Sequence, residues 1–429
     1  MEKIAFLFPG QGSQYIGMTK SLSDRYEIAR QTFEEANDIL GFALDRLCFD
    51  GSLADLGKIE NSLVALLVTS VVSFRVYMQQ IGIAPQFCAG HSLGEFSALT
   101  CSGALRFADA VKIVHLRGKL AREMADKGIG AMTIIDGIQS EVIAAECARQ
   151  STPEQPVAIS CYNSANQAAI SGTQEAVSKV EERILELGGQ VTPLFDNAPF
   201  HCPLMQSAAD QLRAELQKYQ FYYIKWPVIA NITGLPYENQ DKIVETLSAQ
   251  LVRPVQWQKT MHFLQKYGIT LAVELGVKNV LSALIKTETK GINGLSFDQK
   301  EDRQALFDFF AHNELYRKHV PTVITKCLAI AVATPNTNWN NDEYHQGITE
   351  PYRRIKAMQE ELEEKEIQPS VAQMQEALEM LRSVFNTKKV PLLEQIEWYQ
   401  QIFDETATNY LFRDFEMPVP VAEKDSYSS

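Results

Sequence analysis

The sequence lacks the features that mark several classes of protein. Its seven cysteines are scattered and odd in number, and no C-x-x-C pair is present. Neither a disulfide framework nor a zinc site is therefore indicated, and we expect no metal. Basic residues are outnumbered by acidic ones, 40 against 53, and the net charge is −13. This balance disfavours nucleic acid as a partner, because a polyanion would be repelled.

Long apolar runs are also scarce. No uninterrupted run approaches the ~18 residues that a membrane-spanning helix needs. The apolar segment at the start of the chain is cut off at Pro9-Gly10, too early for a signal peptide. We therefore expect a cytoplasmic protein that has no membrane partner.

The chain does contain enough apolar material, 45% of 429 residues, for a large core in more than one domain. Strand-like and helix-like segments alternate over residues 1–126 and 198–295, which predicts an α/β hydrolase-like core around a parallel sheet. Residues 127–197 interrupt this core with the β-α-β-β-α-β order of a ferredoxin-like subdomain. Residues 296–429 are predicted to form a mainly helical extension, with two amphipathic helices separated by Pro369.

The most informative motif is Gly90-His91-Ser92-Leu93-Gly94, which has the G-x-S-x-G pattern of a nucleophile elbow. It follows an apolar run, Ile81 to Ala89, that predicts a buried strand, and it precedes a helix-compatible segment. The glycines allow a tight strand-to-helix turn that presents the serine hydroxyl at its tip. The motif therefore predicts acyl transfer through a serine ester.

A serine hydroxyl needs a positioned base to become a nucleophile. His201 is the best of the seven histidines, because it lies in a loop where the chain returns to the α/β core. A surface or capping histidine is the alternative interpretation of His201. His91 adjoins the serine, where packing within the turn is as good an explanation as a functional role.

Two further features are ambiguous when they are taken alone. The loop Gly10–Gln14 lacks G-x-G-x-x-G and a Walker lysine, so it either aims backbone N–H groups at an oxyanion or forms an ordinary turn. Arg117 lies in a helix-like run, where a solvated surface arginine is the simpler interpretation.

Four motifs together resemble the malonyl-CoA:acyl carrier protein transacylases. They are Phe8–Gln14, Gly90–Glu95, Arg117-Gly118 and Pro199–His201, in this order and spacing. The resemblance covers roughly residues 1–290. The extension resembles that of discrete transacylases that serve hybrid polyketide–nonribosomal peptide synthetases of the iturin and mycosubtilin type.

The resemblance implies a role for each matching residue in catalysis. Ser92 would be the acylated nucleophile and His201 its general base, oriented by the backbone carbonyl of Gln250. The backbone N–H groups of Gln11 and Leu93 would form the oxyanion hole.

The resemblance also implies a substrate pocket. Arg117 would clamp the free carboxylate of malonate, a task that suits a planar guanidinium. Phe200 matches the position where malonyl-selective synthase domains tend to carry phenylalanine, and its ring would crowd an α-methyl group. Further pocket positions are His91, Met132, Asn163 and Asn231.

The implied reaction transfers a malonyl group from malonyl-CoA to the phosphopantetheine thiol of an acyl carrier protein, with no bound cofactor. The enzyme would supply extender units in trans, as a monomer. One alternative is an acyl hydrolase of the same fold that clears acyl groups from carrier proteins, but retention of Arg117 argues against it. An ordinary esterase would need an acid between serine and histidine in the sequence, and a mere docking protein would not need Ser92 and His201.

The extension is acidic, with nine Lys/Arg and sixteen Asp/Glu over residues 344–429. Carrier proteins are themselves typically acidic, so this surface should repel them. The extension is therefore expected either to stabilise the protein or to contact a synthase.

Overall fold

A computed structural model describes residues 3–194, 197–311, 322–365, 367, 369–406, 408, 412, 415 and 417–418. The chain divides into two compact units. Residues 1–77 and 84–309 form the first, here called the α/β body. Residues 78–83 and 310–429 form the second, here called the helical unit. The division after Phe309 leaves most of the helix that follows residue 296 with the α/β body.

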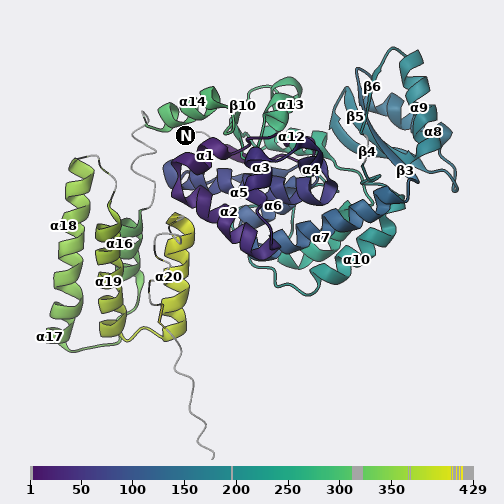
Figure 1. Cartoon of the computed structure of the whole chain (residues 1–429). Helices are drawn as coiled ribbons and strands as arrows, with labels where there is room; N and C mark the ends of the chain where they lie inside the picture. Colours follow the sequence, from purple (N-terminus) through teal and green to yellow (C-terminus); the bar gives the residue numbers. More distant parts are fainter. Residues whose placement is uncertain are drawn as a thin grey trace, which may run out of the picture. The chain divides into compact units, whose positions relative to one another are not determined.

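A six-stranded sheet in the order β10-β9-β1-β2-β7-β8 lies at the centre of the α/β body (Figure 1). All neighbours are parallel except the short pair β7 and β8. Phe8 is paired with Gly90, and Leu7 with Glu274, so three strands end at the same edge of the sheet. The strands are β1 (Ile4–Phe8), β2 (Phe87–Gly90), β7 (Val228–Ala230), β8 (Leu235–Pro236), β9 (Leu271–Glu274) and β10 (Asn293–Ser296).

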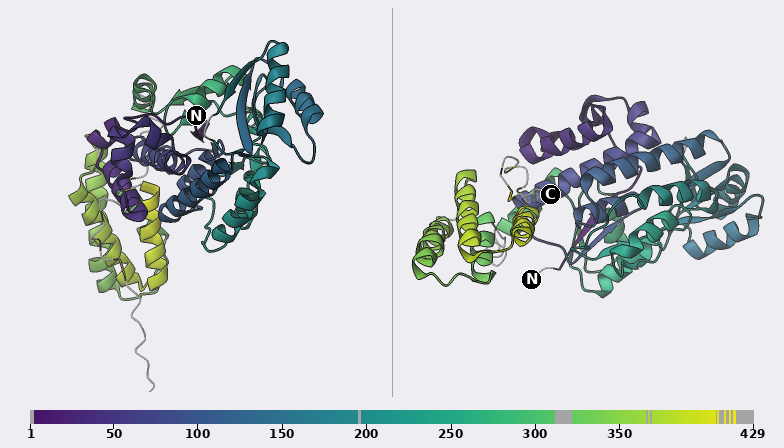
Figure 2. Two further views of the ribbon diagram at one scale, coloured as in Figure 1. Left: turned by 45° about the vertical axis from the view of Figure 1, so that its right-hand side comes forward. Right: turned by 90° about the horizontal axis from the view of Figure 1, so that it is seen from below.

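Helices surround this sheet, as the alternating pattern predicted. α7 and α10 pack side by side (Figures 1 and 2). α6 packs on β1 and β2. The helices are α1 (Lys20–Arg25), α2 (Glu27–Leu40), α3 (Leu44–Asp50), α4 (Leu53–Gly57), α5 (Ile59–Gln80), α6 (Gly94–Cys101), α7 (Phe107–Asp126), η1 (Pro203–Met205), α10 (Gln206–Leu216), η2 (Gln240–Lys242), α11 (Ile243–Gln250), α12 (Trp257–Lys266), α13 (Val280–Glu288) and α14 (Lys300–Ala311).

The apolar content of α5 exceeds the expectation from the sequence. By length and composition this 22-residue helix could cross a membrane, but 78% of its apolar window is buried within the protein. Phe74 and Tyr77 of α5 make edge-to-face contacts with Phe6 of β1. α5 is therefore accounted for as a core helix of a globular protein.

The strand before the serine is shorter than the apolar run Ile81–Ala89 that predicted it. α5 continues to Gln80, and β2 begins only at Phe87. Pro85 explains the late start, because it has no N–H to give to a neighbouring strand. The first backbone hydrogen bond from this segment to β1 is made by Gln86, whose N–H donates to the carbonyl of Ile4 at 2.8 Å.

The inserted segment forms a four-stranded antiparallel sheet in the order β4-β5-β3-β6, with α8 and α9 against one face (Figure 1). Its β-α-β-β-α-β order confirms the ferredoxin-like prediction. Val255 forms a parallel bridge with Cys161 and joins this sheet to the rest of the α/β body. The elements are β3 (Gly130–Asp136), α8 (Ser140–Gln150), β4 (Val157–Ser164), β5 (Gln167–Thr173), α9 (Gln174–Glu186) and β6 (Gln190–Pro193).

The helical unit has its own apolar core, built around α19 and including Leu381, Phe385 and Tyr399. The two predicted amphipathic helices correspond to α18 and α19. A buried lysine, Lys388, donates to the carbonyls of Ala331 and Thr334 at 2.8 and 2.6 Å at the end of α16. The elements are α16 (Val323–Ala333), α17 (Asn341–Tyr344), η3 (His345–Thr349), α18 (Glu350–Glu364), α19 (Val371–Lys388) and α20 (Leu392–Thr406).

Candidate active site

Ser92 lies in a sharp turn between the end of β2 and the start of α6. Its φ angle is +52°, in the left-handed region that serine rarely adopts. The flanking glycines are sterically required. A β-carbon on Gly90 would lie 1.9 Å from the carbonyl oxygen of Gly94, and one on Gly94 would lie 2.0 Å from that of Phe8. The turn has the geometry of the predicted nucleophile elbow, with the serine hydroxyl at its tip.

The turn brings Ser92 against His201, 109 residues further along the chain. The serine Oγ and His201 Nε2 are 2.8 Å apart. On the other side of the ring, His201 Nδ1 is 2.7 Å from the backbone carbonyl oxygen of Gln250. This carbonyl can only accept, so Nδ1 carries the proton and Nε2 is free to accept one from serine. The pair is set up for removal of the serine proton.

The environment of His201 keeps its imidazole neutral. The residue is 2% exposed. Burial lowers the pKa of His201 to about 3, and the positive charge of Arg117 acts in the same direction. The hydrogen bond to the Gln250 carbonyl opposes this shift but does not cancel it. His201 is therefore in its proton-accepting form throughout the physiological range.

Two amide side chains from distant segments hold the backbone of the elbow. Asn231 accepts from the N–H of Ser92 at 2.7 Å and donates to the carbonyl of Gly90 at 2.6 Å. Gln250 donates from Nε2 to the carbonyl of Ser92 at 2.9 Å. These bonds offset the cost of the left-handed conformation, which is on the order of 1–3 kcal/mol.

Arg117 extends from α7 to the same point. Its side chain is among the largest fully buried ones, with the residue only 1% exposed. One terminal nitrogen lies 3.3 Å from Ser92 Oγ, and the guanidinium carbon lies 4.8 Å from the centre of the Phe200 ring. The ring of Phe96 is on another side, at 5.6 Å. Arg117 is therefore not the solvated surface residue that was the simpler interpretation of its sequence context.

The guanidinium of Arg117 is incompletely paired. Among the described residues it forms no salt bridge with a carboxylate, and its buried Nε has no hydrogen-bond partner. Burial lowers the pKa of Arg117 to about 10, while the charge of Glu95 opposes the shift. A buried cation without an anion is costly, and an anionic ligand placed beside Ser92 would relieve that cost.

The backbone N–H groups of Gln11 and Leu93 are also unused. Neither donates to an acceptor within the part of the chain that the structure describes. The side chain of Gln11 donates to Asn197 Oδ1 at 3.2 Å, which ties its loop to the segment that precedes His201. Two free backbone donors at the end of β1 and the start of α6 are what an oxyanion hole requires.

The remaining predicted pocket residues differ in how closely they approach the serine. His91 bonds through Nε2 to Asn163 Oδ1 at 2.9 Å, and its ring contacts Trp257 edge-on. Burial lowers the pKa of His91. Met132 lies in β3, where its carbonyl accepts from Leu194, and no hydrogen bond joins it to Ser92 among the described residues.

The sequence did not single out two residues that belong to this network, Glu95 and Tyr237. Glu95 is fully buried, and its carboxylate accepts from Tyr237 Oη at 2.5 Å and from Gln250 Nε2 at 2.6 Å. An acidic residue in the first turn of a helix is usual, because it complements the helix dipole. Its place directly after the G-x-S-x-G motif was the only available signal.

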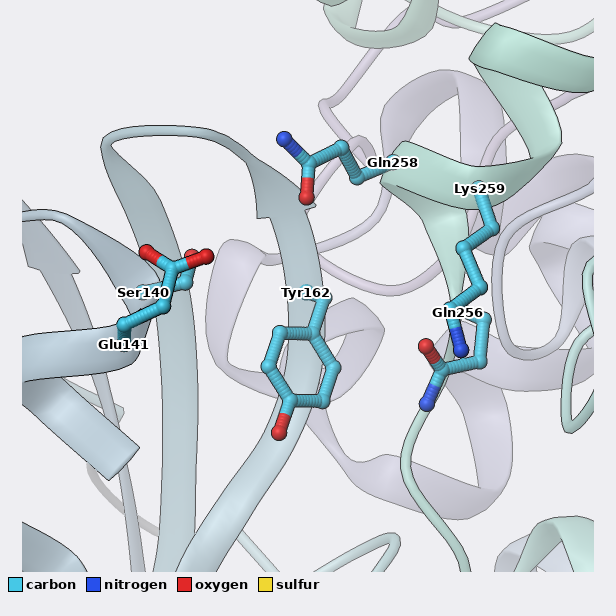
Figure 3. Close-up of a pocket in the computed structure, with 6 residues that line it drawn as sticks. All are labelled: Ser140, Glu141, Tyr162, Gln256, Gln258 and Lys259. Atoms are coloured by element: carbon cyan, nitrogen blue, oxygen red, sulfur yellow. The ribbon is translucent and has the colours of Figure 1, made fainter. Parts of the chain in front are cut away.

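A polar pocket of about 310 Å³ lies where the small sheet meets the start of α12 (Figure 3). Gln256 in its wall donates its N–H to the carbonyl of Asn231 at 2.7 Å. The described residues contain no cluster of His, Cys, Asp or Glu that could hold a metal. The pocket is lined by Ser140, Glu141, Tyr162, Gln256, Gln258 and Lys259.

Comparison with known proteins gives a consistent result. A family model described as "Acyl transferase domain" matches residues 5–298. The malonyl CoA-acyl carrier protein transacylase of Escherichia coli K12 is 40% identical over 287 residues, which cover 67% of this chain and 93% of that protein. A protein of the same name from Bacillus subtilis is 36% identical over 396 residues, covering 92% of this chain and 99% of its own length.

Solved structures agree with these sequence relatives. The transacylase of Coxiella burnetii superimposes with a TM-score of 0.69 and 35% identity, over 72% of this chain and 98% of its own. A malonyl-transacylase in complex with its type II polyketide synthase acyl-carrier protein gives the same TM-score and identity, over 72% and 99%.

Proposed function

Because this chain belongs to the malonyl-CoA:acyl carrier protein transacylase family, we propose that Ser92 carries the malonyl group between coenzyme A and a carrier protein. The protein is an acyltransferase, an acyl-carrier-protein S-malonyltransferase. Its substrates are malonyl-CoA and the phosphopantetheine thiol of the carrier, and no bound cofactor takes part.

The first half-reaction acylates the serine. His201 Nε2 accepts the proton of Ser92 as Oγ attacks the thioester carbonyl carbon. The N–H groups of Gln11 and Leu93 donate to the oxyanion that forms. The C–S bond then breaks, and the proton on His201 passes to the sulfur of coenzyme A. The malonyl group is left as an ester on Ser92.

The second half-reaction reverses these steps with a different thiol. His201 accepts the proton of the carrier's phosphopantetheine thiol, and the sulfur attacks the malonyl-serine carbonyl. The C–O bond to Ser92 breaks, and His201 returns the proton to Oγ. The burial of His201 and Arg117 supports transfer over hydrolysis, because water must be kept from the ester between the two steps.

The observation that carries this proposal is the buried, incompletely paired guanidinium of Arg117 beside Ser92 Oγ. Malonate differs from an ordinary acyl group by a free carboxylate, which can pair with a guanidinium through two hydrogen bonds. An acyl hydrolase that accepts alkyl chains would have to leave this buried cation unpaired. The hydrolase alternative is therefore not favoured.

Phe200 supports a preference for malonyl over methylmalonyl groups. Its ring is 3% exposed and lies against the guanidinium of Arg117, so an α-methyl group beside the clamped carboxylate would meet it. A single methyl group changes the free energy of the transition state by only about 1–3 kcal/mol. The preference should be strong but not absolute.

We further propose that the enzyme acts in trans for a polyketide or hybrid polyketide–peptide synthase of the iturin and mycosubtilin type, as a cytoplasmic monomer. The relative from Bacillus subtilis supports a distinct subgroup, because it matches this chain over 92% of its length, well beyond residue 298. The Escherichia coli relative matches over only 67%. The helical unit would then serve the association with a synthase.

Intact mass spectrometry after brief incubation with malonyl-CoA, acetyl-CoA or methylmalonyl-CoA tests the acyl choice. We expect a malonyl adduct on Ser92 in the wild-type protein. In Arg117→Ala the preference for malonyl over acetyl should fall about 100-fold, because the buried charge pair is lost. Arg75→Ala is the matched control, since Arg75 also lies over a phenyl ring, that of Phe107, but pairs with Glu35.

Two outcomes would contradict the proposal. Rapid hydrolysis without a persistent adduct would indicate an acyl hydrolase. Preferential loading of acetyl by the wild-type protein would show that Arg117 does not select the substrate.

A further inference from the structure

Glu95 is a buried carboxylate that the transfer reaction does not use. It is fully buried in the first turn of α6, and among the described residues its carboxylate makes no hydrogen bond to Ser92 Oγ or to the His201 ring. Its oxygens accept from Tyr237 Oη at 2.5 Å and from Gln250 Nε2 at 2.6 Å, and the backbone N–H of Asn231 also favours the charged form of the carboxyl group. These donors favour the ionised form of the carboxyl group and offset part of the cost of its burial.

Gln250 connects this carboxylate to the reacting groups at two points. Its side-chain nitrogen donates to the carbonyl of Ser92 at 2.9 Å as well as to Glu95. Its backbone carbonyl accepts from His201 Nδ1 at 2.7 Å. Gln250 therefore contacts both the backbone of the serine turn and the imidazole ring of His201, and its position affects how the two are aligned.

We propose that Glu95, supported by Tyr237, is a positioning residue that fixes Gln250 and through it the alignment of His201 with Ser92. The inference rests on the acyl-transfer function proposed above. In a serine–histidine–aspartate triad the aspartate contacts the histidine directly. Here Gln250 lies between the carboxylate of Glu95 and His201. A neutral carbonyl contacts the ring, and the charge behind it holds the carbonyl in place.

The chemistry of the contacts explains why a carboxylate is needed. Glu95→Gln keeps the size of the side chain but replaces one acceptor oxygen with an NH2 group. The new NH2 group would face either Gln250 Nε2, which is itself a donor, or Tyr237 Oη, which could accept from it only by giving up its own acceptor. In either arrangement Gln250 loses the charged acceptor that holds it, and a displacement of about 1 Å in a catalytic group can cost about 100-fold in rate.

The chain offers a matched control for Glu95. Glu274 is also fully buried, at the end of β9, and accepts from the N–H groups of Leu281 and Ser282 at 3.1 and 2.8 Å. Burial raises the pKa of both carboxyls to about 7. Glu274 has no hydrogen bond to Gln250 among the described residues. Glu95→Gln and Glu274→Gln therefore remove the same kind of buried charge, and only the first disturbs the site.

The test compares the two variants by single-turnover acylation with malonyl-CoA and by proton NMR of the His201 Nδ1–H. In Glu95→Gln we expect the maximum acylation rate to fall about 10- to 100-fold with little change in KM, and the downfield Nδ1–H signal to shift or broaden. In Glu274→Gln both should stay at the wild-type value in the folded protein, whatever the melting temperature.

Tyr237→Phe keeps the test decisive if Glu95→Gln does not fold. It should lower the acylation rate by a smaller factor, about 3- to 10-fold, because one of the two side-chain donors to Glu95 is removed while Gln250 keeps its acceptor. Tyr219→Phe is its control, since Tyr219 Oη donates to Glu215 on the surface helix α10.

Three results would overturn the inference. They are wild-type acylation in folded Glu95→Gln, a rise in KM without a change in maximum rate, and an unchanged Nδ1–H signal. If wild-type protein forms no malonyl adduct at all, the proposed function fails instead. The NMR comparison still reports on positioning in that case, because it needs no substrate.

Discussion

Arg117 in the α/β body and Lys388 in the helical unit are both buried cations, 1% and 5% exposed. Lys388 is satisfied by the carbonyls of Ala331 and Thr334, with Thr334 Oγ1 further away at 3.4 Å. Arg117 has Ser92 Oγ at 3.3 Å, two phenyl rings and an Nε without a partner. One buried charge is completed by the fold, and the other awaits a ligand.

The comparison shows how burial should be interpreted. A buried charge whose hydrogen bonds are complete is a structural element, because removing it leaves partners unsatisfied. A buried charge that lies beside a nucleophile and lacks hydrogen-bond partners carries a desolvation penalty, and a bound anion would offset this penalty. The two regions should therefore respond to mutation in different ways, the α/β body in chemistry and the helical unit in stability.

The largest expected effect is in the α/β body. Ser92→Ala should abolish the malonyl adduct and lower transfer to carrier protein by at least about 10⁴-fold, because no other group forms the ester. Ser97→Ala is the matched control, since the Ser97 hydroxyl is buried in α6, the helix that follows the elbow, and has no hydrogen-bond partner. Intact mass after malonyl-CoA separates them. Residual adduct in Ser92→Ala would place the acyl group elsewhere.

Lys388→Met should lower the stability of the helical unit by about 2 kcal/mol, because the carbonyls of Ala331 and Thr334 lose their donor. Acylation of Ser92 should not change. Lys389→Met is the control, since Lys389 is the exposed neighbour with the same charge. Native-state hydrogen exchange of the backbone amides of α16 and α19 measures the difference. A loss of acylation in folded Lys388→Met would contradict the separation of roles.

The acylation rate of the wild-type enzyme should fall up to about 10-fold between pH 8 and pH 6. Burial raises the pKa of Glu95 to about 7, so lowering the pH through 7 protonates this carboxylate and weakens its hold on Gln250. Protonation of His201 cannot cause this fall in rate, because its pKa is lowered to about 3. Tyr237 and Arg117, the other titratable groups facing Glu95, stay protonated throughout. If the acylation rate of Glu95→Gln still falls between pH 8 and pH 6, another group is responsible for the pH dependence.

The smallest expected effect is that of removing the helical unit. A chain ending at Phe309 should acylate Ser92 within about 3-fold of the full-length rate, because its length corresponds to that of the Escherichia coli relative. Transfer to carrier domains of a synthase in trans should fall if the unit serves that association.

Trp339→Ala tests the same association without removing the helical unit, since this side chain is 89% exposed there. Equal transfer by all three proteins would leave the unit with a stabilising role.

Local patterns predicted the fold well and the site in part. The alternation of apolar segments gave the parallel sheet, and the order of elements gave the ferredoxin-like insert. The pairing of Ser92 with His201, and of His201 with the Gln250 carbonyl, followed from resemblance to a family. Glu95 and Tyr237 were missed, because a glutamate at a helix start and a tyrosine after a short strand look ordinary until the fold brings them together. The start of β2 was misplaced because Ile81, Ile83 and Ala84, which lie between α5 and β2, extend the same apolar run.

The contacts around Ser92 also have a consequence for biosynthesis. The residues that shape the elbow lie far downstream: His201 by 109 positions, Asn231 by 139 and Gln250 by 158. A ribosome that adds about 5–20 residues per second needs many seconds to make that stretch. Until β7 and α11 are in place, nothing holds Ser92 in its left-handed conformation or takes its proton. The nascent chain is therefore catalytically silent, and the serine becomes reactive only in a chain whose α/β body is almost complete.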